Sequence, residues 1–242
     1  MNTVIITGAS SGIGLATAEA FLQEGWTVGL IARRAEMLED VASRYDTAIP
    51  LPADVTDEQG MAEAFDGFVD ITGRLDVLFN NAGMFGPQDT IDQISVADWR
   101  MTVDVNLTGM FIAAQLAFRQ MRKQSPQGGR IINNGSISAH TPREGSVCYT
   151  STKHGVTGLT KTLALDGREF DIAAGQIDIG NARTDLVEGL AQRRAADGLS
   201  ELPTMDVGDV ARSVLHMANL PPEANVLSMM VMASKMPHVG RG

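Results

Sequence analysis

Two side chains that could exchange a proton stand four residues apart in the segment YTSTK, residues 149–153. One turn of helix would place the phenol of Tyr149 and the ammonium of Lys153 on the same face. Such a pair could be an accident of the surface. It could instead be an acid–base catalyst in which the cation favours the phenolate. The elements around the segment decide between these alternatives.

Short apolar runs alternate with longer helix-like segments along almost the whole chain. The runs show no polar alternation, which is typical of a parallel sheet covered by helices on both faces. The alternation predicts a Rossmann-type, doubly wound α/β fold with right-handed crossovers and a mainly parallel, seven-stranded sheet. The YTSTK segment opens an expected helix, VCYTSTKHGVTGLTKTLALDG. The expected strands are TVIIT, TVGLIA, AIPLPA, LDVLF, RIINNGS, DIAAGQIDI and NVLSMMVMA.

The chain has no linker rich in Pro, Gly or Ser and no repeat at solenoid spacing. Residues 1–242 are therefore expected to form a single domain. Residues 182–204 are less regular, polar and rich in Arg and Asp. They are interpreted either as a mobile lid over a site or as a plain surface insertion.

A glycine-rich turn follows the first expected strand and opens the first expected helix. It reads ITGASSGIG and places Gly8, Gly12 and Gly14 in the spacing G-x-x-x-G-x-G. Glycine permits positive φ and close backbone approach, and the helix N-terminus behind the turn attracts a pyrophosphate. In this strand–turn–helix context the spacing predicts a dinucleotide site. The alternative is a tight turn in an α/β protein that binds no dinucleotide.

The second expected strand ends in IARR. A unit that binds NAD usually has an acidic residue here for the ribose 2′-hydroxyl, whereas this chain has Ala32 followed by Arg33 and Arg34. Guanidinium groups suit a 2′-phosphate, although both arginines could merely solvate the start of the next helix. Because no carboxylate stands at the ribose position, NADP(H) is favoured over NAD(H). The glycine loop has Ser11 where it could have carried a further basic residue.

Composition limits the other classes of function. A formal net charge of −10 argues against a nucleic-acid partner, since phosphate backbones need clustered Lys and Arg. The lone Cys148 is interpreted as a packed residue. The absence of a leader pattern after Met1, and of an uncharged stretch near the length of a membrane span, predicts a cytoplasmic protein with no membrane partner. No metal is expected, because the four histidines lack ligand spacing: His140, His154, His216 and His238.

Several short motifs follow one another along nearly the whole chain, and together they resemble the short-chain dehydrogenase/reductase family. They are TGASSGIG at residues 7–14, DV at 54–55, NNAG at 80–83, VN at 105–106, GSIS at 135–138 and YTSTK. The most specific detail is Ser136, which stands thirteen residues before Tyr149.

The resemblance implies roles for these residues. Tyr149 would be the catalytic acid/base, Lys153 would hold the nicotinamide ribose and lower the pKa of the tyrosine, and Asn106 would anchor a water leading to solvent. Substrate contacts are expected from Ser136, Ser138 and Tyr149. Among them Ser136 would hydrogen-bond the substrate oxygen. Cofactor contacts are expected from Gly8, Ser10, Ser11, Gly12, Ile13, Gly14, Arg33, Arg34, Asp54, Val55, Asn81, Ala82, Gly83, Tyr149, Lys153, Gly180 and Thr184.

The implied chemistry agrees with the properties of a phenol. Its free pKa of about 10 would have to fall to about 7 for base catalysis, which requires roughly 4 kcal/mol. A neighbouring ammonium and an oxidised nicotinamide ring are sources of that stabilisation. In the reductive direction the tyrosine would donate its proton, and Ser136 would stabilise the oxyanion.

The expected function is therefore an NADP(H)-dependent oxidoreductase of carbonyl reductase type, which interconverts a small-molecule ketone or aldehyde and an alcohol. Two alternatives stay open. One is a regulatory protein that binds NADPH without chemistry, and the other is an epimerase or dehydratase on the same fold. The resemblance also implies a homodimer or homotetramer. The segment NLTGMFIAAQLAF is apolar enough to serve both a core and a partner helix.

The chain departs from the family pattern after the catalytic helix, where it reads QIDIGNARTDL. Gly180 and Thr184 fall where expected, but Ile179 replaces a proline. Asp178 is unusual on an apolar strand, and is interpreted either as a cap or ion-pair residue or as a group that shapes substrate choice. Pocket walls are expected from Ile137, Ser138, residues 140–146 and the segment after Thr184. Within them Arg143 or Arg183 could meet an acidic substrate or simply be solvated.

Overall fold

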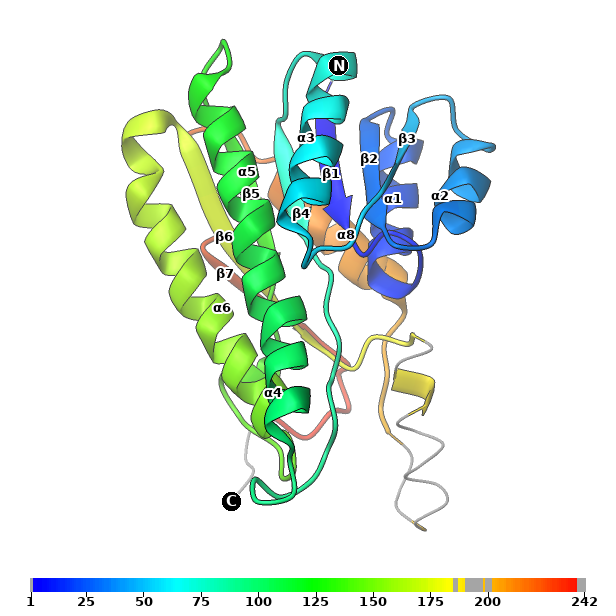
Figure 1. Ribbon diagram of the computed structural model, residues 1–242, viewed down its shortest axis with the longest axis vertical. Helices are drawn as coiled ribbons and strands as arrows, with labels where there is room; N and C mark the ends of the chain where they lie inside the picture. The colour runs from blue at the N-terminus through cyan, green and yellow to red at the C-terminus, as the bar shows by residue number, and fades with distance from the viewer. Residues whose placement is uncertain (1, 185–186, 190–197, 199–201, 239–242) are drawn as a thin grey trace.

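The computed structural model describes residues 2–184, 187–189, 198 and 202–238. Within them seven strands form one sheet in the order β3-β2-β1-β4-β5-β6-β7, with every pair of neighbours parallel (Figure 1). This architecture confirms the predicted doubly wound α/β fold. The strands are β1 (Thr3–Thr7), β2 (Thr27–Ala32), β3 (Ala48–Pro52), β4 (Val77–Asn80), β5 (Gly129–Asn134), β6 (Ile172–Gly180) and β7 (Ser228–Met232).

Helices cover both faces of the sheet (Figure 1). In β1, Val4 and Ile6 belong to the core beneath α1, α2 and α8, whereas Ile5 belongs to the core beneath α3 and α5. Because successive side chains of a strand point to opposite faces, one apolar run supplies both cores. The helices are α1 (Gly12–Gln23), α2 (Ala35–Ala42), α3 (Glu58–Thr72), α4 (Val96–Val103), α5 (Gly109–Lys123), α6 (Val147–Asp166) and α8 (Val207–Ala218), with short helical turns η1 (Asp104–Thr108), η2 (Ile137–Ala139) and η3 (Arg168–Phe170).

The continuous helical stretch Val96–Lys123 comprises α4, η1 and α5. Its length and its mean hydropathy of 1.3 would suffice to span a membrane by composition alone. In the fold this apolar character is used for packing, because Ile112, Ala113, Ala117 and Met121 are buried in the core beneath α3 and α5. The helix that carries the predicted VN motif is thus part of the layer on one face of the sheet.

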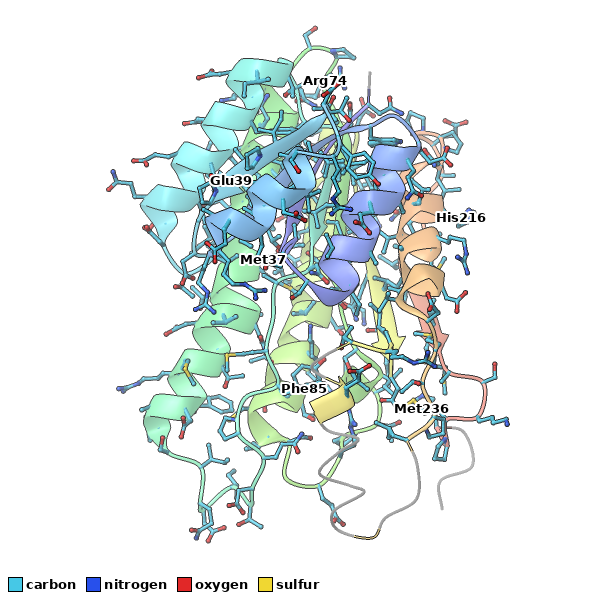
Figure 2. The ribbon with its side chains drawn as sticks, turned by 90° about the vertical axis from the view of Figure 1, so that its right-hand side faces the viewer. Met37, Glu39, Arg74, Phe85, His216 and Met236 are labelled. Carbon is cyan, nitrogen blue, oxygen red and sulfur yellow. The ribbon has the colours of Figure 1, made fainter. Side chains whose placement is uncertain are left out.

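The chain reverses its direction across the sheet between β1 and β4. It runs outward from β1 to β2 and β3, then crosses to β4 on the other side of β1. In open α/β sheets a ligand crevice lies at the carboxyl ends of the strands beside such a reversal. Figure 2 shows Phe85, which follows β4, in the lower half of the molecule, whereas Arg74, which precedes β4, lies near its top.

The segment predicted as a lid, residues 182–204, lies largely outside the described residues. At its near end Ala182 pairs with Met205 through an isolated β-bridge. Before it, β6 continues through Ile179 and Gly180, with Gly180 paired to Met232 of β7. Isoleucine keeps the backbone N–H and the freedom in φ that proline lacks, so the strand can extend to this point.

Candidate active site

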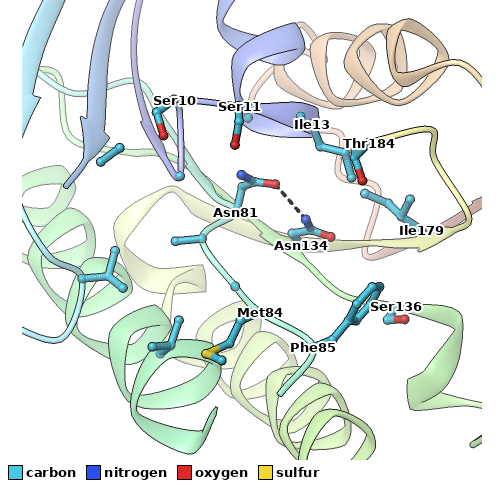
Figure 3. A pocket seen from close by; sticks show the side chains of 18 of the residues that line it. Ser10, Ser11, Ile13, Asn81, Met84, Phe85, Asn134, Ser136, Ile179 and Thr184 are labelled. Atoms are coloured by element: carbon cyan, nitrogen blue, oxygen red, sulfur yellow. Dashed lines mark hydrogen bonds between the residues drawn. The ribbon is translucent and has the colours of Figure 1, made fainter. Parts of the chain in front are cut away.

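A cavity of about 610 Å³ lies at the carboxyl edge of the sheet and is lined by the loops that follow β1 to β6. Its size is that of a small-molecule or cofactor site. Figure 3 shows it between Ser10 and Ser11 of the glycine turn on one side and Phe85 and Ser136 on the other. The lining contains every residue predicted for the site except Asn106, Ser138 and Gly180.

The glycine turn takes the backbone shape that the sequence predicts. Gly8 and Gly12 have positive φ angles of 69° and 54°. A Cβ atom on Gly14 would lie 2.1 Å from the carbonyl oxygen of Gly8, so no side chain fits there. Helix α1 begins with Ser11 as N-cap, which makes no side-chain capping hydrogen bond, and its first turn carries no acidic residue. Its N-terminal N–H groups therefore suit an anion such as a pyrophosphate.

Polar side chains join the ends of three strands along the floor of the cavity. The hydroxyl oxygen of Thr7 accepts hydrogen bonds from the backbone N–H groups of Asn81 (2.8 Å) and Ala82 (3.0 Å). Asn134 Nδ2 donates to Asn81 Oδ1 at 2.8 Å (Figure 3). These bonds hold β1, β4 and β5 in register where the predicted cofactor path crosses the sheet.

Two guanidinium groups line one end of the cavity. Arg34 Nη2 donates to Ser10 Oγ at 3.0 Å, which ties the end of β2 to the glycine turn. Arg33 Nη1 lies 3.9 Å from Asp54 Oδ2, and the Arg33 side chain is 79% exposed. Such a long, solvated ion pair contributes little stability, so Arg33 can turn to an anionic ligand. Among the described lining residues Asp54 is the one carboxylate.

Helix α6 places Tyr149 and Lys153 one turn apart, as the YTSTK spacing predicts. Lys153 is buried, and its Nζ donates to the carbonyl oxygen of Asn134 at 2.7 Å. The same Nζ lies 5.5 Å from the centroid of the Tyr149 ring. Burial lowers the pKa of Lys153 to about 8, although the negative charge of Asp178 acts in the opposite direction.

Tyr149 lies beside Ser136 and beneath Phe85. The rings of Phe85 and Tyr149 pack edge to face with their centroids 5.0 Å apart. Burial raises the pKa of Tyr149 above its usual value, and Asp178 adds to the rise, while the Ser136 hydrogen bond and the charge of Arg143 act against it. The phenol is therefore protonated at neutral pH before any cofactor binds, and it can act as an acid.

Asn106 lies behind the cavity in the π-helical segment η1, a kind of distortion that often marks functional sites. Its Oδ1 accepts from the backbone N–H of Met84 at 2.8 Å, and its Nδ2 donates to the Met84 carbonyl at 2.8 Å and to Thr152 Oγ1 at 3.2 Å. The side chain thus joins the loop after β4 to α6. The implied role of Asn106 as a water anchor stays a prediction.

The two other predicted residues outside the lining are buried supports. Ser138 is fully buried, and its backbone N–H donates to Ser136 Oγ at 3.1 Å. In this geometry Ser138 orients the serine that faces the cavity, while its own contact with a substrate stays a prediction. Gly180 lies against β7, where an added Cβ would be 2.9 Å from the Cβ of Met232. Thr184 does line the cavity, close to Gly12.

Of the predicted pocket walls, Arg143 lines the cavity, whereas Ile137, His140 and the exposed Arg183 do not.

Sequence reasoning missed Met84 and Phe85, which follow the NNAG motif directly, and Asn134, which directly precedes GSIS. Their position beside these motifs at the carboxyl edge was the available indication. That Phe85 would contact Tyr149 depends on how the loop after β4 folds back.

The chain matches known proteins over nearly its whole length. A family model described as short chain dehydrogenase matches residues 2–195. Serine 3-dehydrogenase of Agrobacterium fabrum is 32% identical over 238 residues, which cover 95% of this chain and 93% of that protein. The solved structure of ElxO with NADP bound has a TM-score of 0.86 at 27% identity and covers 96% of this chain and 97% of that one. A 3-ketoacyl-(acyl-carrier-protein) reductase from Brucella melitensis complexed with NADH shares the fold, with a TM-score of 0.87 at 23% identity and coverage of 96% and 97%.

Proposed function

Because the chain belongs to the short-chain dehydrogenase/reductase family of oxidoreductases, we propose that it uses NADP(H) to interconvert a ketone or aldehyde and an alcohol, with Tyr149 as acid/base. One observation carries the proposal. Tyr149, Ser136 and Lys153 line one region of a cavity whose other end holds the glycine turn and two guanidinium groups. That arrangement suits a dinucleotide held at one end and a reacting carbonyl at the other.

A bound nicotinamide would supply or accept the hydride. In reduction, Tyr149 Oη donates its proton to the substrate oxygen, and the Ser136 hydroxyl donates a hydrogen bond to the negative charge that develops there. Lys153 stabilises the resulting phenolate through its positive charge. The carbonyl of Asn134 holds the ammonium in place for this role.

The preference for NADP(H) rests on the end of β2. Arg33 and Arg34 line the cavity there, and Ala32 occupies the position at which a carboxylate would repel a 2′-phosphate. Arg34 is held by Ser10, so its fork is oriented before any ligand binds. Of the two solved relatives described above, one carries NADP and the other NADH. Titrations of this protein with NADPH and with NADH measure which cofactor it prefers.

The substrate end supports a carbonyl compound that carries an acidic group. Arg143 lines the cavity, and its positive charge reaches Tyr149. The serine of serine 3-dehydrogenase, a relative, carries a carboxylate. The variant Arg143→Gln should raise KM for a carboxylate-bearing substrate by about tenfold or more, as expected for loss of a charged hydrogen bond. KM for an uncharged analogue should change little, and the exposed Arg183→Gln serves as the matched control. An equal rise in KM for both substrates would exclude an acidic group at Arg143.

The decisive test is turnover of a panel of aldehydes, ketones and hydroxy acids, followed through the absorbance of the nicotinamide. Net oxidation or reduction of the cofactor supports the proposal. Tight NADPH binding with no turnover of any compound supports a regulatory protein instead. Conversion of a substrate without net change in the cofactor supports an epimerase or dehydratase.

We also propose that the protein is a homodimer or homotetramer. Helices α4 and α5 expose large apolar side chains, including Trp99 (37% exposed) and Phe111 (49% exposed). Exposed apolar side chains of this size favour a protein–protein contact.

A further inference from the structure

We propose that Asp178 is a positioning residue for the proposed reaction: its buried carboxylate, held by His140, fixes Ser136 against the substrate oxygen, and its charge acts on the acid Tyr149. The inference rests on the proposed function for its catalytic part only. Its electrostatic part concerns Tyr149 in the free protein and can be measured without a substrate.

Asp178 lies near the end of β6 and is buried, with its side chain only 1% exposed. A carboxylate in such a place is stable only if its oxygens are paired or hydrogen-bonded. Both oxygens of Asp178 have partners. Oδ1 accepts from the backbone N–H of Ser136 at 2.9 Å and from Gln176 Nε2 at 2.6 Å, and Oδ2 lies 2.9 Å from His140 Nε2.

These contacts hold both ends of one short turn. Ser136 is the N-cap of η2 and His140 is its C-cap. Inside the turn, the backbone N–H of Ala139 donates to the Ser136 carbonyl at 2.9 Å. Because one carboxylate holds the backbone at the start of η2 and the side chain at its end, the turn cannot shift along the strand without breaking a bond to Asp178. The Ser136 backbone is thereby fixed, and the N–H of Ser138 in the same turn holds its hydroxyl oxygen.

The same carboxylate is joined to the helix that carries Tyr149 and Lys153. Gln176 Nε2, which donates to Asp178, also lies 3.1 Å from Thr157 Oγ1 of α6. Gln176 Oε1 accepts from Thr160 Oγ1 of α6 at 3.2 Å. Loss of the hydrogen bonds of Asp178 would therefore change the position of Ser136 relative to the Tyr149 phenol, in addition to loosening the turn η2.

The charge of Asp178 has an effect beyond geometry. Four ionisable groups bear on this cluster within the described residues: His140 contacts the carboxylate, Lys153 and Tyr149 experience its charge, and Arg143 opposes it at Tyr149. The negative charge raises the pKa of Lys153 and of Tyr149. It holds the proton on the phenol, so Tyr149 is present as the acid that reduction requires, although as a weaker acid than it would be without this charge.

The variant Asp178→Asn separates charge from shape. An amide of the same size can still accept from the Ser136 N–H through its oxygen, so the turn is retained while the charge is lost. The chain has two tyrosines, so in a Tyr45→Phe background the phenolate absorbance reports Tyr149 alone. We expect Asp178→Asn to move that titration to lower pH by roughly half a unit or more. An unchanged titration would overturn the electrostatic role, whatever the enzyme turns over.

The variants Asp178→Ala and His140→Ala test positioning. Each should lower kcat about 10- to 100-fold while the dissociation constant for NADPH stays nearly unchanged, since the loss concerns orientation of the reacting groups. His216→Ala is the control, because His216 is exposed on α8 (Figure 2). If Asp178→Ala does not fold, kcat of His140→Ala decides, because Asp178→Asn retains the turn. Wild-type kcat in His140→Ala would overturn the positioning role. Wild-type protein that turns over no carbonyl would instead count against the proposed function.

Discussion

Lys153 and Asn134 form a short hydrogen bond in the candidate active site, in which the lysine Nζ donates to the asparagine carbonyl oxygen at 2.7 Å. The bond joins α6 to the end of β5 and keeps the ammonium 5.5 Å from the centre of the Tyr149 ring. A lysine that is otherwise free to move is thus fixed in the place from which its charge acts on the phenol. Backbone geometry sets this place, so substitutions of the Asn134 side chain would leave it largely intact.

Replacement of Tyr149 by phenylalanine should abolish most turnover. The ring would keep its packing against Phe85, whereas the proton donor would be lost. We expect kcat to fall by about 100-fold to 10,000-fold, the usual contribution of general acid–base catalysis. Steady-state kinetics measure the loss, and an NADPH titration should give a dissociation constant close to wild type. Retained turnover would remove Tyr149 from the mechanism.

Cofactor affinity should decrease as the pH rises through about 8. The buried Lys153 loses its proton in that range, because its pKa is lowered to about 8. A neutral amine no longer favours the negatively charged cofactor or donates with full strength to its ribose. Fluorescence titrations with NADPH across the pH range measure the effect. The step should disappear in Lys153→Met and remain in Lys161→Met, a change at an exposed lysine on the same helix. A flat pH profile would contradict the role of Lys153.

Loss of either arginine at the end of β2 should weaken NADPH binding much more than NADH binding. A guanidinium–phosphate hydrogen bond contributes about 1.5–3 kcal/mol, so Arg34→Ala should raise the dissociation constant for NADPH by about 10- to 100-fold. Arg33→Ala should act in the same direction. Arg44→Ala is the control, since Arg44 pairs with Glu19 and lies outside the lining. Equal loss of affinity for both cofactors would show that the arginines do not recognise the 2′-phosphate.

The change Gly14→Ala should strongly destabilise the glycine turn, because the new Cβ would lie 2.1 Å from the Gly8 carbonyl oxygen. Cofactor binding should be lost, and the thermal midpoint should fall. Gly158→Ala is the matched control on helix α6, where an added Cβ meets nothing within 4 Å. It should raise stability by about 0.5–1 kcal/mol through helix propensity. Thermal unfolding of the two variants distinguishes a steric requirement from a general effect of alanine.

The variant Phe111→Asp should dissociate the proposed oligomer. Phe111 is 49% exposed on α5, so the change should leave the core intact. A charge buried in an interface without a partner is costly, which favours the separated subunits. Light scattering should give a smaller mass for the variant than for the wild type. The exposed Leu165→Asp on α6 is a comparison that shows whether the effect belongs to α5. A monomeric wild type would contradict the oligomer.

Sequence alone determined the fold and most of the candidate site. Apolar runs without polar alternation predicted the parallel sheet. The spacing of four residues between Tyr149 and Lys153 predicted that both side chains lie on one face of a helix. The glycine spacing predicted the turn. Each of these depends on local backbone geometry, and so the residue types and their spacing are sufficient to predict it.

Only the tertiary structure decided which loops meet. It brought Phe85 onto Tyr149, and it gave Asp178 a partner in His140, 38 residues away. Of the two interpretations of Asp178, the structure supports the first, since the carboxylate contacts His140 and accepts from the backbone N–H of Ser136. It also placed Arg143 in the cavity lining and left Arg183 outside it. These contacts arise where segments distant along the chain are packed together by the two cores, and no local pattern encodes such pairings.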